Sequence, residues 1–247
     1  MIYLKNSADI AKMRVAGKIV RDTLLLLEEK CVAGITTKEL DTIAYKYIIS
    51  QNAKPSFLGY NDFPASICAS INEEVVHGIP GNRVIKDGDI VSLDVGAFID
   101  GFHGDAARTV GVGNVAAEVR QLIDVTKESF FKGVAQFKDG NRLSDISTAI
   151  QNYAESFGYG VVRVMVGHGI GHSMHEDPEV PNYYTGRRGI LLQEGLALAI
   201  EPMINLGTYD VYQHSNGWTV ITSDKKPSAH YENTVVLTKD GLEILTI

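Results

Sequence analysis

The sequence predicts an α/β protein made of two halves that share one plan, because the order helix, helix, strands occurs twice along the chain. Four helices are expected, at 8–29, 36–49, 115–138 and 143–157, and strands follow each pair. A weak internal repeat agrees with this plan: Gly88 precedes Asp94 by six residues, and Gly195 precedes Glu201 by the same number. We therefore expect one duplicated domain that covers residues 1–247.

The composition narrows the class of protein. The 247 residues are 45% hydrophobic and 21% charged, which is ordinary for a globular enzyme. A net charge of -7 argues against a nucleic-acid-binding surface, and no apolar run approaches the roughly 20 residues that span a bilayer. Two cysteines, Cys31 and Cys68, are too few for a disulfide framework, and the first residues lack a secretory apolar core. These features predict a cytoplasmic location.

In the first half, Ser7 is expected to cap a helix that continues to about Glu29, and Thr36 or Thr37 is expected to cap the second helix. A loop rich in glycine, proline and aromatic residues follows at 54–64, and a short strand is expected at 66–71.

In the second half, the turn at 139–141 separates two further helices. A strand is expected at 161–166, ending on the segment Gly167-His168-Gly169, and a long connection then runs to about residue 189. Further strands are expected at 196–201, 218–222 and 231–237.

A hairpin carries the first chemical signal. Asp100-Gly101 favours a tight turn between two apolar runs, which places Asp94 opposite Ala107 and puts Asp105 on the same face, diagonal to Asp94. Two carboxylates about 5 Å apart repel each other by roughly 3 kcal/mol at an effective dielectric constant of about 20. A shared proton, an arginine or a cation must offset that repulsion, unless both acids are solvated on the surface.

Three further residues could join this pair. Glu201 ends a strand before Pro202, Glu232 lies at the start of another strand, and His168 lies between two glycines. Two Asp, two Glu and one His form an oxygen-rich ligand set that suits Mn(II), Fe(II), Co(II) or Zn(II). Each Glu alone has a simpler interpretation as an exposed strand-end acid.

Other candidates have weaker support. His175-Glu176 begins like the His-Glu-x-x-His motif of zinc proteases, but position 179 is Glu and Pro178 breaks the helix that this motif needs. Cys68 has no base near it in sequence and is expected to be a buried thiol.

Taken together, these segments resemble the type I methionine aminopeptidases in their short bacterial form, over nearly the whole chain. The matching motifs occur in the order of that family: Ser70-Ile71-Asn72-Glu73, His77-Gly78-Ile79-Pro80, Leu93-Asp94-Val95-Gly96, Gly104-Asp105, Gly167-His168-Gly169-Ile170-Gly171, Met174-His175-Glu176, Ile200-Glu201-Pro202 and Tyr231-Glu232-Asn233-Thr234. The resemblance implies the duplicated pita-bread fold, an antiparallel sheet covered by two helix pairs related by approximate two-fold symmetry. It also implies a chain without the N-terminal extension of the longer eukaryotic enzymes.

The resemblance implies a site for two divalent ions (Co, Mn, Fe or Zn). Asp94 would bind one ion, His168 and Glu201 the other, and Asp105 and Glu232 would bridge both. A water held between the ions would be the nucleophile.

The resemblance also assigns catalytic and substrate-binding residues. Glu201 would accept the proton of that water, His175 would hydrogen-bond the scissile carbonyl, and His77 would contact the scissile nitrogen. The methionine pocket would be lined by Phe57, Tyr60, Phe63, Cys68, Met174 and Trp218.

Four positions depart from the usual family pattern. Phe57 and Met174 differ from a common Cys and Phe, and His230 and Asn233 replace the usual Gln and His around Glu232. The last two are expected to alter how Glu232 is oriented or how tightly the second ion is held.

The function predicted by resemblance is removal of the initiator methionine from nascent proteins and peptides whose second residue is small. The expected partners are nascent N-termini, with the ribosome as a further candidate, and the expected state is a monomer. Two alternatives remain: a peptidase acting before proline, which usually has a large additional N-terminal domain, and a metal-free pita-bread protein that only binds polypeptide.

Overall fold

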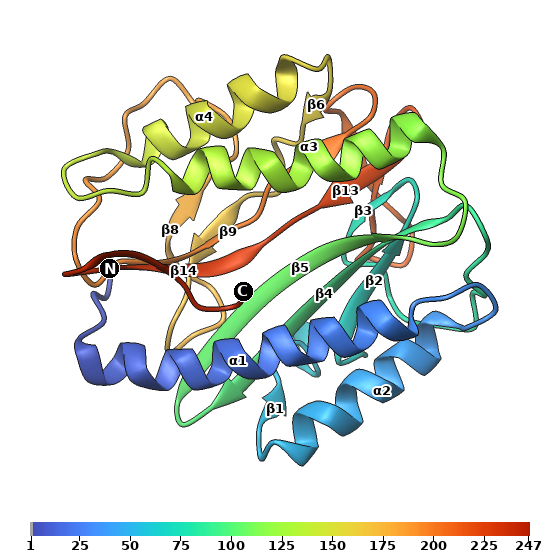
Figure 1. Ribbon diagram of the computed structural model, residues 1–247, viewed down its shortest axis with the longest axis horizontal. Coiled ribbons are helices and arrows are strands. Elements are labelled where there is room, and N and C mark those ends of the chain that lie inside the picture. Colours follow the sequence, from blue (N-terminus) through green and yellow to red (C-terminus); the bar gives the residue numbers. More distant parts are fainter. Residues whose placement is uncertain (1) are drawn as a thin grey trace.

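The computed structural model describes residues 2–247 and has its helices in two pairs on opposite sides of the strands (Figure 1). One pair is α1 (Ser7–Lys30) and α2 (Thr37–Ser50), and the other is α3 (Ala117–Val134) and α4 (Leu143–Glu155). This architecture confirms the predicted α/β class with a helix pair for each half.

The strands form four antiparallel sheets. The first half contributes β1 (Lys54–Pro55), β2 (Ile67–Ile71), β4 (Ile90–Ile99) and β5 (Phe102–Gly111), ordered β1-β4-β2 with β5 on β4. The second half contributes β7 (Gly167–Gly169), β8 (Glu176–Val180), β9 (Ala197–Ile200), β14 (Asn233–Thr238) and β15 (Gly241–Ile244), ordered β15-β14-β9-β7-β8. Two smaller sheets hold β6 (Gly160–Val161), β10 (Met203–Asn205) and β13 (Ser228–His230), and β3 (Glu74–Val76), β11 (Val211–Gln213) and β12 (Val220–Thr222). A single 3₁₀ turn, η1 (Tyr60–Asp62), lies in the loop after β1.

The cap of α1 differs from the prediction. Asn6, and not Ser7, is the N-cap: its side chain accepts hydrogen bonds from the backbone N–H groups of Ala8 and Asp9, and Asp9 bonds back to the Asn6 backbone. This reciprocal pair satisfies more of the free N–H groups at the helix start than Ser7 alone could. The predicted cap of α2 at Thr36 is confirmed.

The prediction of a strand at 161–166 is also wrong. Pairing stops at Val161, and it resumes only at β7, where the chain lies so close to β9 that a Cβ on Gly167 would be 2.4 Å from the carbonyl oxygen of Ala199. Gly167 and Gly169, which the prediction placed at the end of a strand, instead allow β7 to pair, because a side chain at either position would meet a neighbouring backbone. The edge strand β8, which contains Pro178, was not predicted, since proline is tolerated only at such edges.

Close packing fixes the β4–β5 hairpin against α1. Apolar residues of α1 such as Leu24 and Leu27 share a core cluster with Leu93 and Val95 of β4. A Cβ on Gly104 of β5 would lie 3.0 Å from a backbone nitrogen of α1, so the hairpin and helix touch backbone to backbone. None of the helices within residues 2–247 combines the length and apolar character needed to cross a bilayer.

Candidate metal centre

The β4–β5 hairpin has the register predicted from its turn. Asp94 pairs with Ala107, Gly96 pairs with Asp105, and Asp100 and Gly101 have the positive φ values of 52° and 84° that the turn requires. The two carboxylates therefore lie on one face of the sheet as diagonal neighbours.

The second half brings the other candidates to the same face. His168 on β7 pairs with Ala199 of β9, and Glu201 follows the end of β9. Glu232 lies just before β14 and is tied to β5 by two backbone hydrogen bonds with Ala107, of 3.0 and 3.3 Å. The candidate ligands meet where the two halves of the chain join.

The distances between these side chains are longer than hydrogen bonds and fall in the range expected for two ligands of one ion. His168 Nε2 lies 3.5 Å from Glu201 Oε1 and 3.8 Å from Asp105 Oδ2, whereas an N–H···O bond is about 2.9 Å long. Two donors that are each about 2.1 Å from one ion lie between about 3 and 4 Å apart. The Nδ1 of His168 is 2.9 Å from the carbonyl oxygen of Gly169, which accepts its proton and leaves the lone pair of Nε2 free toward the acids.

Burial makes the electrostatics of the cluster unfavourable without a cation. Burial first, and then mutual repulsion, raises the pKa values of Asp105, Glu201 and Glu232 well above their usual range, and burial raises the pKa of Asp94 to about 7. Burial lowers the pKa of His168 to about 3, so its imidazole is neutral and able to ligate.

Protein groups compensate these charges only in part: the Cys68 thiol hydrogen-bonds Asp94, and the charge of Arg108 opposes the rise in the pKa of Glu232. One oxygen each of Asp94, Asp105 and Glu232 is buried without a hydrogen-bond partner. The guanidinium group of Arg108 donates hydrogen bonds to the carbonyl oxygens of Ala107 and Glu232 and to the side-chain oxygen of Asn233. It donates none to the carboxylates of the cluster. Of the offsets named from the sequence, a divalent cation fits best, because buried unpaired charges are costly and hard oxygen donors suit such ions.

One cavity of about 220 Å³ is lined by every residue that the sequence assigned to the site. These residues are Phe57, Tyr60, Phe63, Cys68, His77, Asp94, Asp105, His168, Met174, His175, Glu201, Trp218 and Glu232. Four others were not predicted: Asn61, Val76, Met165 and Val166. Met165 and Val166 were assigned to a strand, and their position directly before the Gly-His-Gly segment was the signal that could have identified them.

Part of the lining of this cavity is apolar. The rings of Phe63 and Trp218 meet edge to face with centroids 5.0 Å apart, and Cys68 and Met174 are buried beside the cavity. Burial, and then the neighbouring Asp94, raises the pKa of Cys68 well above its usual value, so this residue remains a thiol.

Two histidines, His77 and His175, also line the cavity. His175 Nδ1 is 2.8 Å from the Tyr60 hydroxyl, and its ring centroid is 4.2 Å from that of His168. His77 has a left-handed φ of 59° and meets Trp218 edge to face. Burial lowers the pKa of both, that of His77 to about 4, so both rings are neutral near pH 7.

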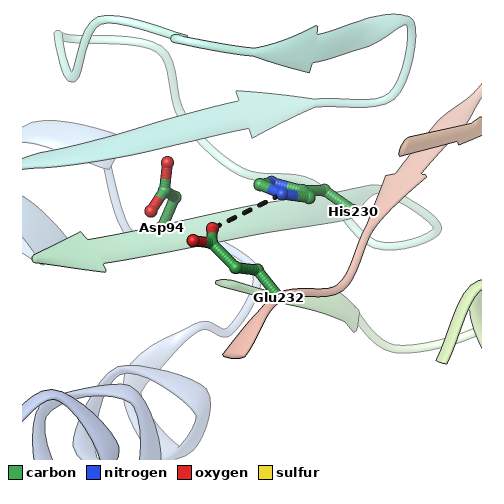
Figure 2. Close-up of side chains that lie close together, drawn as sticks. All are labelled: Asp94, His230 and Glu232. Atoms are coloured by element: carbon green, nitrogen blue, oxygen red, sulfur yellow. Dashed lines mark ion pairs between the residues drawn. The ribbon is translucent and has the colours of Figure 1, made fainter. Parts of the chain in front are cut away.

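A third histidine was underestimated from the sequence. His230 is 2% exposed, and its Nε2 lies 3.6 Å from Glu232 Oε2 and 4.0 Å from Glu201 Oε2. Figure 2 shows its ring and the Glu232 carboxylate reaching from neighbouring positions of one segment toward Asp94. Its position two residues before Glu232 was the signal, since alternate strand residues share a face.

Residues 11–239 match the family described as Metallopeptidase family M24. The protein named methionine aminopeptidase from Clostridium acetobutylicum is 58% identical over 100% of this chain and 99% of its own length. Methionine aminopeptidase 1 from Bacillus subtilis is 50% identical with the same two coverages. The crystal structure of methionine aminopeptidase from Rickettsia prowazekii matches the fold with a TM-score of 0.97, at 44% identity and over 100% of both chains.

The chain belongs to metallopeptidase family M24. The resemblance to type I methionine aminopeptidases and the pita-bread fold that it implied are both confirmed. Membership of a metallopeptidase family also means that the protein uses divalent metal, for which the grouped carboxylates and histidines are candidate ligands.

Proposed function

We propose that this chain is a methionine aminopeptidase, which hydrolyses the first peptide bond of nascent proteins and peptides that begin with methionine and have a small second residue. The observation that carries the proposal is the shared cavity: carboxylates and histidines with ligand spacing and a set of apolar and aromatic side chains line the same space. The relatives named methionine aminopeptidase, which match over the full length, support the same substrate.

The metal centre would use five ligands. Asp94, Asp105, His168, Glu201 and Glu232 would hold two divalent ions between them. Their unpartnered oxygens and the spacing of His168 from Glu201 and Asp105 support this set. The ions, of Co, Mn, Fe or Zn, supply Lewis acidity that activates water and polarises the scissile carbonyl.

The chain's own residues would do the remaining work around the peptide bond. Glu201 accepts the proton of the attacking water, because its carboxylate lies at the meeting point of the ligands and the cavity. A hydrogen bond from the Tyr60 hydroxyl to His175 Nδ1 would leave the ring proton on Nε2, which then donates to the carbonyl oxygen as charge develops. His77, which lines the same cavity, contacts the scissile nitrogen and assists its protonation.

The apolar pocket would hold the methionine side chain. Phe57, Tyr60, Phe63 and Trp218 present aromatic surface, and Cys68 and Met174 complete the wall. Thioether sulfur packs favourably against aromatic edges, so such a wall suits a flexible methionine better than a charged or branched side chain.

The test is release of the first residue from matched tripeptides. Purified protein with Mn(II) or Co(II) should release methionine from Met-Ala-Ser, with little release of leucine from Leu-Ala-Ser and little of methionine from Met-Lys-Ser. Excess chelator should abolish the reaction. Absence of metal-dependent methionine release would end the proposal.

The two alternatives give different results. A peptidase acting before proline would cleave Ala-Pro or Met-Pro in preference to Met-Ala-Ser. A protein that only binds polypeptide would retain no divalent ion after dialysis, and elemental analysis would show this directly. The match to methionine aminopeptidases favours neither alternative.

We further propose that the chain acts as one catalytic domain and as a monomer in the cytoplasm, on free peptides and on nascent chains at the ribosome. Its two cysteines are free and buried, which agrees with a reducing compartment. Sedimentation of the purified protein, alone and with ribosomes, tests both its oligomeric state and this partner.

A further inference from the structure

His230 is a buried histidine whose backbone is held and whose ring is not. Its N–H donates to Thr109 Oγ1 at 2.8 Å, and its carbonyl oxygen accepts from the same hydroxyl at 2.9 Å. Within the described residues neither ring nitrogen has a hydrogen-bond partner, although the side chain is only 2% exposed. A buried ring whose nitrogens have no partner indicates a ligand that the protein atoms do not supply.

The ring faces the carboxylates and not the substrate pocket. His230 is not among the described residues that line the cavity. Its Nε2 and one carboxylate oxygen each of Asp94 and Glu232 all lie within 4.8 Å of one another (Figure 2). The ring therefore lies close to the acids without being part of the cavity lining.

The spacing distinguishes ligation from hydrogen bonding. His230 Nε2 is 3.6 Å from Glu232 Oε2, which is longer than a hydrogen bond of about 2.9 Å and within the range of about 3 to 4 Å between two donors to one ion. His168 Nε2 lies at a similar distance, 3.5 Å, from Glu201 Oε1. Two imidazoles thus approach the acids with the same spacing.

We propose that His230 Nε2 is a sixth metal ligand, which gives the ion held by Asp94 and Glu232 an imidazole of its own. This inference rests on the proposed two-ion centre and goes beyond it, because the five-ligand set leaves that ion with oxygen donors alone. An added imidazole favours Co(II), Fe(II) and Zn(II) over Mn(II), which prefers oxygen donors.

The direct test is proton NMR of the intact protein loaded with excess Co(II). A histidine bound to Co(II) through Nε2 shows a strongly shifted, exchangeable Nδ1–H resonance, and both candidate Nδ1 atoms are shielded from solvent. We expect two such resonances in the wild-type protein and one in His230→Gln, whose amide cannot replace the imidazole. His214→Gln, which alters an exposed histidine, is the matched control and should keep both.

The second measurement is Co(II) affinity, determined by competition with a chelating indicator. His230→Gln should raise the Kd of one of the two ions at least tenfold and change the other less than twofold, with a smaller effect on Mn(II). Two bound ions with a single shifted resonance in the wild-type protein would overturn the role of His230 and leave the two-ion centre intact. Failure of the wild-type protein to bind Co(II) would overturn both, and the wild-type spectrum decides the matter even if His230→Gln folds poorly.

Discussion

Replacing Asp94 by Asn should stabilise the metal-free protein and at the same time weaken its response to metal. The substitution removes one of the four clustered carboxylates, a half-buried one, and keeps the size of the side chain. The new amide can donate a hydrogen bond to the neighbouring Asp105, whose Oδ1 has no partner. The fold should therefore survive, and the charge balance of the cluster should change.

The magnitude follows from the pKa of Asp94, which burial raises from 3.8 to about 7. That difference corresponds to about 4 kcal/mol between the charged and neutral forms, and partial exposure of the side chain to solvent reduces it to roughly 2 kcal/mol. Because the folded state holds the proton more tightly than the unfolded state, this contribution is favourable at low pH. Stability is lost as the pH rises from about 4 to about 7, and the whole penalty is present at pH 8.

The assay is urea unfolding at pH 8 and pH 5, each with a chelator and with saturating Mn(II). With chelator at pH 8, Asp94→Asn should be about 2 kcal/mol more stable than the wild-type protein, and the difference should shrink at pH 5. With Mn(II), the wild-type protein should gain much more stability than the variant, since ligand binding to the folded state alone is stabilising.

The control is Asp100→Asn, which makes the same chemical change on the same hairpin at an exposed turn position, where Asn is equally suited to a positive φ. It should match the wild-type protein under all four conditions. If metal-free Asp94→Asn were less stable than the wild-type protein at pH 8, the reasoning that a desolvated, charged Asp94 destabilises the metal-free fold would be refuted.

Three further predictions concern other parts of the site. His175→Ala should keep the wild-type metal content and lose at least a hundredfold in kcat, because it removes a donor to the transition state; loss of metal instead would place His175 among the ligands. Gly167→Ala should lower the free energy of unfolding in urea by about 1–3 kcal/mol, because the new Cβ would lie 2.4 Å from the Ala199 carbonyl oxygen. Unchanged stability would contradict the close approach of β7 and β9. Lys5→Met should lower the free energy of unfolding by about 3 kcal/mol, because it leaves Glu176, only 12% exposed, without its ion-pair partner. The control is Lys12→Met, which removes an exposed lysine, and equal effects of the two substitutions would exclude the ion pair as the cause.

Local chemistry explains which parts of the fold could be predicted. The turn Asp100-Gly101 and alternation along two strands were enough to place Asp94 opposite Ala107 with Asp105 on the same face. Strand β8 and the short β7 could not be found this way. Their pairing depends on glycines that meet another backbone and on a proline tolerated only at a sheet edge, and neither leaves an alternating pattern.

The sequence by itself determined the two-halved order of elements, the paired carboxylates and the motifs that carry the family likeness. Only the tertiary structure decided that His230 joins Asp94 and Glu232, and that acids and aromatic residues share one cavity. The physical reason is the separation along the chain of the residues that interact. Turns and helix caps depend on neighbours a few residues away, whereas the site forms where β5 meets the segment before β14, more than a hundred residues later in the chain.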